Sequence, residues 1–154
     1  MRKIIYINGP SFTGKSWLHN KISCYFAKNN IKFSNICFEQ YFRSYNAELS
    51  FYNAIEQKAE DSVVIAESVQ FNQFDPDHAL NIICFPTIED HLRNRTACAN
   101  TFGEDYADSR VFGYTIGRIR QLFKRDYKHN PNELTYDRTN LDDILSKARK
   151  YAVK

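Results

Sequence analysis

A glycine-rich stretch near the N-terminus constrains this sequence more than any other feature. It satisfies the pattern G-x-x-x-x-G-K-[ST] with Gly9, Pro10, Ser11, Phe12, Thr13, Gly14, Lys15 and Ser16, and Trp17 comes next. An apolar, strand-like run at 3–8 precedes the stretch, and apolar residues at helical spacing follow it from 15 to 29. This strand-loop-helix context is the one in which the pattern forms a phosphate-binding loop.

The residue types of the loop explain what it is expected to hold. Glycines let the backbone wrap inward so that successive N–H groups point at one anion, and the helix that follows adds its positive N-terminal end. Lys15 is expected to reach the β- and γ-phosphates of ATP, and the Ser16 hydroxyl to ligate Mg²⁺. Phe12 is unusual, because it places a bulky ring where small residues are common.

The rest of the sequence alternates short apolar runs with longer helical stretches. Strands are expected at 3–8, 31–38, 62–67, 80–85 and 133–137, and helices at 15–29, 46–60, 87–99, 108–127 and 141–151. Asn140 is a suitable N-cap for the last helix, and 73–79 reads as a turn. Because hairpin turns are missing between the strands, the pattern predicts a three-layer α/β/α P-loop NTPase fold with a five-stranded, mostly parallel sheet. Ligands of such sheets bind at the carboxyl ends of the strands, which brings Glu39 and Glu67 toward the loop.

Size and composition fit one domain spanning 1–154, with the apolar content of a folded protein. The net charge of +3 suits an anionic ligand such as a nucleotide but is too small for a protein that coats nucleic acid. The four cysteines form no C-x-x-C pair and are expected to be free thiols. No apolar run approaches the ~18 residues of a membrane span, so we expect a cytoplasmic protein without a membrane partner. The oligomeric state is not indicated.

Several classes of P-loop protein fit poorly. The guanine-reading motif N-K-x-D is missing from the sequence, and the third strand does not close on Asp-Glu as in hydrolytic ATPases. The chain is also too short for an AAA module. A small kinase needs only the phosphate loop, a carboxylate for the acceptor hydroxyl and arginines for the transferring phosphoryl group.

The stretch KIIYINGPSFTGKSWL resembles the opening of small P-loop kinases of the nucleoside/nucleotide kinase superfamily. Within them it is similar to the phage-type polynucleotide 5′-kinases and the chloramphenicol phosphotransferase-like group, and the closing ELTYDRTNLDDILSKA resembles the last strand and helix of many such kinases. The resemblance implies an acidic general base after the second strand, which falls on Glu39 in NICFEQYFRS, with Arg43 as an acceptor contact. Glu stands here where Asp is usual.

The resemblance also implies a lid at about 87–108, where Arg93 and Arg95 would close over the phosphates. Glu67 ends the third strand and competes with Glu39 as acceptor base, or serves as a ligand to Mg²⁺-bound water or as a substrate contact. A basic stripe of Arg120, Lys124 and Lys128 is either a solvated helix face or a groove for a polyanionic acceptor.

The leading hypothesis is an ATP- and Mg²⁺-dependent phosphotransferase acting on a small nucleoside or nucleotide. One alternative is a polynucleotide kinase that phosphorylates a nucleic-acid 5′ end. Another is a nucleotide-binding regulatory protein without transfer activity.

Overall fold

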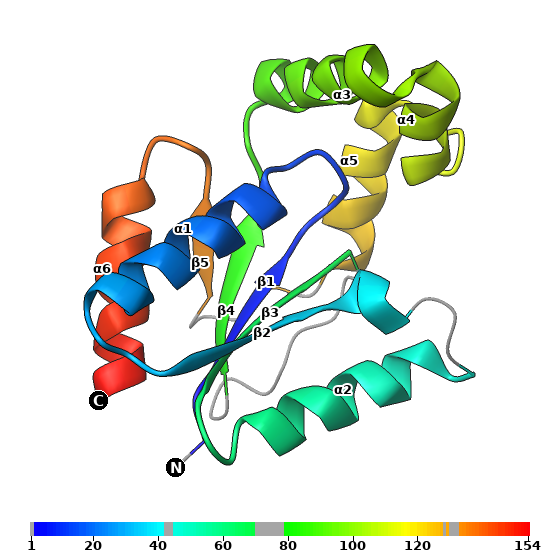
Figure 1. Cartoon of the computed structure of the whole chain (residues 1–154). Coiled ribbons are helices and arrows are strands. Elements are labelled where there is room, and N and C mark those ends of the chain that lie inside the picture. The colour runs from blue at the N-terminus through cyan, green and yellow to red at the C-terminus, as the bar shows by residue number, and fades with distance from the viewer. Residues whose placement is uncertain (1, 42–44, 70–78, 128, 130–132) are drawn as a thin grey trace.

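In the computed structural model, the five strands of the described part of the chain run parallel in one sheet, in the order β2-β3-β1-β4-β5 (Figure 1). The structure describes residues 2–41, 45–69, 79–127, 129 and 133–154. The strands are β1 Ile4–Asn8, β2 Phe33–Cys37, β3 Val63–Ser68, β4 Ala79–Cys84 and β5 Leu134–Tyr136. The predicted fold class is therefore confirmed, and the sheet is parallel throughout.

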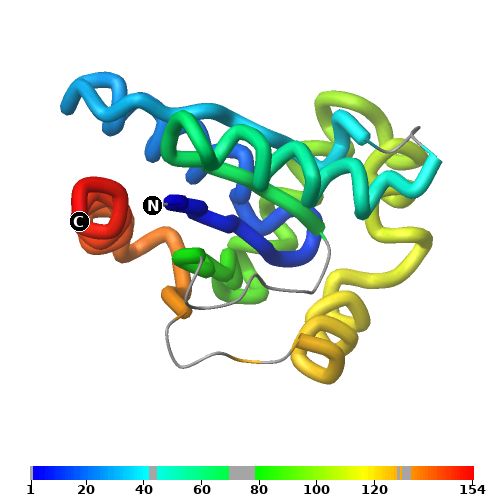
Figure 2. The backbone as a smooth tube through the Cα atoms, turned by 90° about the horizontal axis from the view of Figure 1, so that it is seen from below, coloured from blue at the N-terminus to red at the C-terminus, as the bar shows by residue number. Residues whose placement is uncertain are grey.

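Helices cover both faces of this sheet. They are α1 Lys15–Lys28, α2 Ala47–Lys58, α3 Ile88–Phe102, α4 Glu104–Arg110, α5 Ile116–Asp126 and α6 Leu141–Val153, with a 3₁₀ turn η1 at Phe38–Tyr41. Seen along the sheet, α6 and α5 lie on opposite sides of it (Figure 2). Helices α3 and α4 lie above the carboxyl ends of the strands, next to the loop that joins β1 to α1 (Figure 1).

Alternation along the strands divides the core between the two faces. Ile5 and Ile7 of β1 point to one face, where they pack with α1 and α6 in a cluster that includes Leu18, Ile22 and Ile144. The intervening residues of β1, Ile4 and Tyr6, point to the other face. One cluster there joins them to Phe51 and Ile55 of α2, and a second joins Ile83 of β4 to Phe123 of α5. A central parallel strand is buried on both faces, which explains why β1 reads as an unbroken apolar run.

The predicted helix at 108–127 is wrong in one respect, because it is two helices. Phe112 and Gly113 have left-handed φ values of 56° and 76° and separate α4 from α5. Gly113 adopts that conformation readily, which ends the helix there. The new helix begins at Ile116 after its N-cap Thr115, whose hydroxyl accepts a hydrogen bond from the backbone N–H of Arg118.

The expected N-cap at Asn140 has a different role. Its side chain makes no cap bond to α6; instead Nδ2 donates to the carbonyl of Thr135, and Oδ1 accepts from the N–H of Asp137. The predicted turn at 73–79 lies outside the described residues except for Ala79, which begins β4. Within the described ranges, every helix is too short or too polar to cross a membrane.

Candidate active site

The loop between β1 and α1 is built on two glycines that no other residue replaces easily. A Cβ on Gly9 would lie 2.6 Å from the carbonyl oxygen of Cys84, so the loop can approach β4 only without a side chain. Gly14 has a φ of 89° and precedes the first residue of α1, Lys15. The backbone therefore turns directly into the helix N-terminus, which is the geometry of an anion-binding loop.

Lys15 is buried inside this loop. Its Nζ donates to the carbonyl oxygen of Pro10 at 2.6 Å, which spans the loop from its start to its end. Burial lowers the pKa of Lys15 from 10.5 to about 8. The loop thus holds a buried positive charge that is hydrogen-bonded to a carbonyl oxygen. Such a charge attracts phosphate strongly.

The structure explains the unusual Phe12. Its backbone has a left-handed φ of 68°, and its ring packs against the apolar cluster of Val111, Ile116 and Ile119 at the base of α5. Its carbonyl oxygen accepts a hydrogen bond from Asn94 Nδ2 at 2.9 Å. Phe12 therefore connects the phosphate loop to α3 and α5.

A buried histidine makes a second tie, which the sequence did not indicate. His91 lies one turn before Asn94 on α3 and donates from Nε2 to the carbonyl oxygen of Ser11 at 2.8 Å. Its Nδ1 faces the Arg120 guanidinium at 3.2 Å. Burial lowers the pKa of His91 to about 4, so the ring is neutral and accepts from Arg120. Arg120 also donates to the carbonyl oxygen of Pro86, and its guanidinium lies over the ring of Phe85. This member of the basic stripe therefore has a structural role.

Ser16 and Glu67 form the oxygen pair at the mouth of the loop. The Ser16 hydroxyl donates to Glu67 Oε2 at 3.0 Å, and both residues line a cavity of about 200 Å³. Burial raises the pKa of this carboxyl group, but the hydrogen bonds that it accepts from His19, Cys37 and Ser16 outweigh burial and lower its pKa to about 2. A carboxylate and a hydroxyl beside a phosphate loop are hard oxygen donors of the kind that Mg²⁺ takes together with phosphate and water. The residues present therefore fit Mg²⁺.

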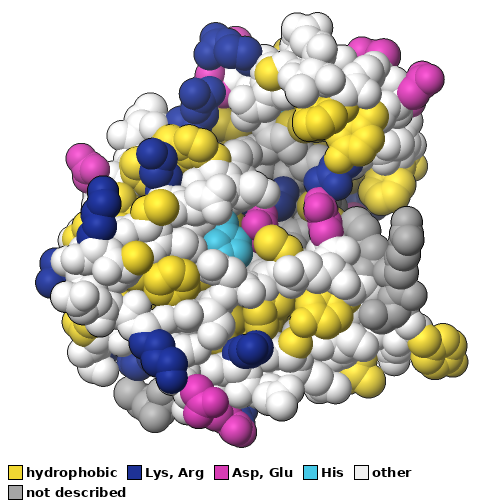
Figure 3. Space-filling view, viewed as in Figure 1, with side chains coloured by type: hydrophobic (Ala, Val, Ile, Leu, Met, Phe, Trp, Pro, Cys, Tyr) yellow, Lys and Arg dark blue, Asp and Glu magenta, His cyan; other side chains and the backbone are white. Residues whose placement is uncertain are grey.

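Glu39 lies across the same cavity. It follows β2 in the turn η1 and forms an ion pair with Arg110, the last residue of α4, at 2.5 Å. Arg110 lines the cavity as well, and its carbonyl oxygen accepts a hydrogen bond from the Ser11 hydroxyl at 3.1 Å. Acidic and basic side chains accordingly lie next to one another in the hollow between the helices α3 and α4 and the sheet (Figure 3).

The two predicted lid arginines lie elsewhere. Arg93 is 70% exposed and pairs with Asp90 on its own helix, while Arg95 pairs with Glu104 and joins α3 to α4. Within the described part of the chain, neither of them lines the cavity at the phosphate loop. Arg43 lies outside the described residues.

Arg110 is the arginine that the structure brings to the loop instead. It falls inside the stretch predicted as one continuous helix, where no motif distinguishes it from the neighbouring charged residues. The chain breaks after α4, at Phe112 and Gly113, and Arg110 at the end of α4 contacts Ser11 and Glu39.

Two further cavities adjoin the loop. One of about 410 Å³ is lined by Phe12, Gly14, Trp17, Asn94, Tyr136 and Arg138. Its aromatic wall is Trp17 stacked on Tyr136, with ring centroids 6.2 Å apart. The other, of about 350 Å³, is mainly apolar and lies beyond Arg110, lined by Pro10, Ser11, Val69, Tyr106, Ser109, Arg110, Val111, Phe112 and Ile119.

No known protein family and no curated protein matches this sequence. Solved structures do match its fold. The protein APE1195 has a TM-score of 0.60 at 11% identity over 97% of this chain and 96% of its own. The Mycobacterium tuberculosis APS kinase CysC, in complex with AMPPNP and APS, has a TM-score of 0.59 at 16% identity over 99% of both chains. A sugar kinase from Janibacter sp. HTCC2649 has a TM-score of 0.53 at 8% identity over 98% and 94%. The chain has the P-loop kinase fold.

At these identities the likeness concerns the P-loop kinase fold alone. The resemblance to the phage-type and chloramphenicol phosphotransferase-like kinases stays a prediction. The reaction must be argued from the cavity itself, because one fold carries many activities.

Proposed function

We propose that this protein is an ATP- and Mg²⁺-dependent phosphotransferase that acts on a small nucleoside or nucleotide. One observation carries the proposal: a single cavity is lined by the phosphate loop with Lys15, by the Ser16–Glu67 oxygen pair and by the Glu39–Arg110 ion pair. In the proposal, the loop with Lys15 binds the phosphates of the donor and the Ser16–Glu67 pair binds the metal ion. The Glu39–Arg110 pair supplies a carboxylate and an arginine for the acceptor. Together they meet the needs of phosphoryl transfer.

The donor half of the proposal rests on the loop and the cavity beside it. The loop N–H groups and Lys15 would hold the phosphates, and Ser16 with Glu67 would hold Mg²⁺ through oxygen atoms. Bound Mg²⁺ would supply charge neutralisation at the phosphate oxygens. The purine would lie in the 410 Å³ cavity against Trp17, with Arg138 at its edge.

The acceptor half rests on Glu39 and Arg110. The Glu39 carboxylate is 53% exposed at the cavity mouth, where it is accessible to a hydroxyl group. It would accept the acceptor proton while the acceptor oxygen bonds to the γ-phosphorus and the bond to the β–γ bridging oxygen breaks. Arg110 would turn from Glu39 to the transferring phosphoryl group and neutralise its charge. The ion pair between them is thus a resting contact that the substrates replace.

The cavities favour a small acceptor over a nucleic-acid end. The 350 Å³ cavity beyond Arg110 offers Tyr106 and Phe112 as apolar surfaces for a base or ring of the acceptor. A polynucleotide acceptor instead needs free cations along a groove. Arg120, which belonged to the predicted basic stripe, is engaged with Pro86 and His91, and Lys128 lies outside the described residues.

The test is transfer of labelled γ-phosphate from ATP to a panel of nucleosides, nucleoside monophosphates and 5′-hydroxyl oligonucleotides. With the best acceptor, Glu39→Gln is expected to lower kcat by about 10²–10⁴-fold with little change in ATP affinity, because only proton transfer is lost. Arg110→Lys keeps the charge but loses the planar guanidinium, and we expect at least a tenfold loss of kcat. Glu56→Gln is the matched control, because Glu56 also forms an ion pair with an arginine but lies on α2, away from the loop.

Undiminished turnover in Glu39→Gln would remove that residue from the mechanism and leave Glu67 as the acceptor base. Labelling of oligonucleotides alone would establish the polynucleotide alternative. ATP binding without any labelled product would overturn the transferase proposal and support a regulatory nucleotide-binding protein.

A further inference from the structure

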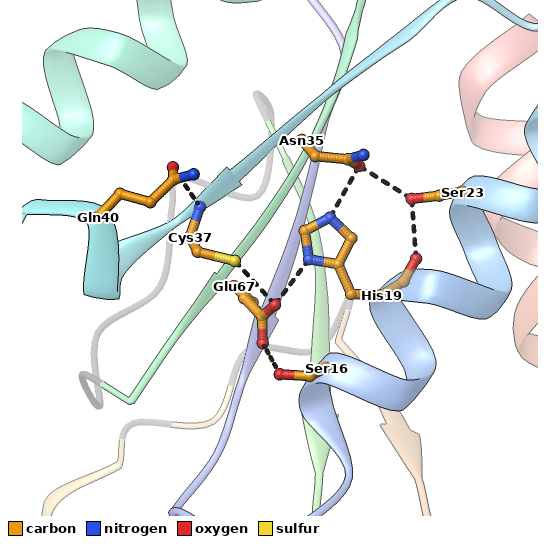
Figure 4. A network of polar contacts seen from close by, with 7 residues as sticks. All are labelled: Ser16, His19, Ser23, Asn35, Cys37, Gln40 and Glu67. Carbon is orange, nitrogen blue, oxygen red and sulfur yellow. Dashed lines mark hydrogen bonds and ion pairs between the residues drawn. The ribbon is translucent and has the colours of Figure 1, made fainter.

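Three side chains of different chemistry converge behind the phosphate loop. His19 comes from the second turn of α1, Cys37 from the end of β2 and Glu67 from the end of β3, and they point toward one another (Figure 4). One nitrogen, one sulfur and one oxygen atom from these residues lie within 4.8 Å of each other. The phosphate loop does not require this set, because Mg²⁺ binds oxygen atoms and avoids thiol groups.

The orientation of the histidine shows which atom it offers. His19 Nε2 lies 2.8 Å from Asn35 Oδ1, and Ser23 Oγ also donates to that oxygen at 2.9 Å. With Oδ1 as the shared acceptor, Nε2 carries a ring proton. Nδ1 lies 3.0 Å from Glu67 Oε1 and donates to it through a second ring proton when no metal ion is bound. Loss of that proton would leave the Nδ1 lone pair directed between the two atoms, where a metal ion can bind both.

Asn35 supplies the outer contact that metal-binding histidines have. Such histidines almost always donate their second ring N–H to an oxygen atom, which fixes the ring and the nitrogen that binds the metal. Ser23 in turn donates to Asn35, and its hydroxyl also lies 3.0 Å from the carbonyl oxygen of His19. This arrangement holds a ring nitrogen in place beside a thiol group and a carboxylate.

We propose that His19 Nδ1, Cys37 Sγ and Glu67 Oε1 bind a divalent cation of borderline softness, of the Zn²⁺ class. Cys37 Sγ donates to Glu67 Oε1 at 2.9 Å, so binding releases the thiol proton and the Nδ1 proton of His19 to solvent and replaces two hydrogen bonds by metal–ligand bonds. A thiolate, an imidazole and a carboxylate match Zn²⁺ in ligand type. With three protein ligands, the fourth position of a tetrahedral ion stays open.

The site has an access route and a relation to the neighbouring oxygen pair. Cys37 and Glu67 both line the cavity at the loop, so an ion can enter from solvent. Glu67 uses Oε1 for this cluster and Oε2 for Ser16, so one carboxylate borders both sites. The proposal goes beyond the proposed phosphotransfer and stands whether or not that reaction occurs.

The test is a titration of the tag-free protein with CoCl₂, without nucleotide and with a non-thiol reductant. Co²⁺ replaces Zn²⁺ in such sites and reports a thiolate ligand by a near-ultraviolet charge-transfer band. One equivalent is expected to give this band, and ZnCl₂ is expected to abolish it. Cys37→Ser is expected to lose the band, whereas Cys24→Ser, which removes an exposed thiol group from α1, is expected to keep it.

The histidine and its outer contact have their own variants. His19→Gln is expected to weaken Co²⁺ binding at least tenfold. Asn35→Asp keeps an oxygen atom that accepts from Nε2 and is expected to retain binding, whereas Asn35→Leu is expected to weaken it by about 10–100-fold. Circular dichroism and thermal unfolding of each apo variant establish that it is folded.

The outcomes separate the proposal from its rivals. A folded wild-type protein without the thiolate band overturns the proposal and leaves the cluster as a hydrogen-bonded support for Glu67. A band that survives in Cys37→Ser but disappears in Cys24→Ser also overturns it, because the ion then binds at the protein surface. Weakening by Asn35→Asp equal to that by Asn35→Leu refutes the proposed role of Asn35 and the histidine orientation that carries the proposal.

Discussion

Replacing Lys15 by methionine should stabilise the nucleotide-free protein while it destroys the phosphate site. Burial lowers the pKa of Lys15 from 10.5 to about 8. At about 1.4 kcal/mol for each pH unit, keeping the charge in the loop costs roughly 3 kcal/mol at pH 7. Methionine keeps most of the stem but has no charge. Losing the bond to Pro10 offsets about 1 kcal/mol, which leaves a gain of about 2 kcal/mol.

For a chain of this size such a gain corresponds to a rise in Tm of about 4–8 °C. Urea unfolding and thermal unfolding would measure it. Lys150→Met is the control, because Lys150 is an exposed lysine on α6 and should change stability by less than about 0.5 kcal/mol. The fluorescence of Trp17, the only tryptophan, would report nucleotide binding. It should respond to ATP in the wild type and not in Lys15→Met.

The pH dependence tests the cause of this effect. Between pH 8 and 10.5 the unfolded lysine holds its proton while the native one has released it, so the stability of the wild type rises with pH relative to the variant. The advantage of Lys15→Met should therefore shrink by about 1.4 kcal/mol from pH 7 to pH 9. A variant that is less stable than the wild type at pH 7, or an advantage independent of pH, would refute the reasoning.

Two other perturbations test the ties between the loop and the helices above it. Because the pKa of His91 is lowered to about 4, its native ring binds fewer protons than the unfolded one, and the wild type should lose about 2 kcal/mol of stability from pH 7 to pH 5. His91→Asn should remove that part of the slope in urea unfolding at the two pH values; an unchanged slope would assign it to other groups. Phe12→Ala should lower the free energy of unfolding by about 2–4 kcal/mol, because the ring packs on Val111 and Ile119. A loss below 1 kcal/mol, compared with the exposed Phe102→Ala as control, would show that this ring does not hold the loop to α5.

The sequence predicted the sheet well because its signals are local. Except after 62–67, each predicted strand is a short apolar run followed by a helix, and helical connections of this kind produce parallel neighbours. The phosphate loop is equally local, since its glycines, Lys15 and Ser16 follow one another directly. The break at Phe112 and Gly113 was missed because the apolar spacing of a helix continues on both sides of it.

The acceptor side of the site depends on contacts between distant residues. The resemblance implies an acceptor base at Glu39, after β2, but the ion-pair partner of Glu39 is Arg110, which lies 71 positions later in a stretch without a motif. The resemblance implies that Arg93 and Arg95 are lid arginines. In the structure, Arg93 forms an ion pair within α3, and Arg95 forms one between α3 and α4.

Hydrophobic periodicity and loop backbone geometry are properties of neighbouring residues, so the order of the amino acids is enough to predict the fold class and the loop where phosphate is expected to bind. The folded arrangement of helices and sheet sets which side chains surround that loop. It brought Arg110 to Glu39, His91 to Ser11 and His19 to Glu67, pairs separated by tens of residues. It also explains Phe12, because this bulky ring of the loop packs against Ile116 and Ile119 of helix α5. Such pairings depend on how the helices dock on the sheet, and sequence spacing carries no record of that docking.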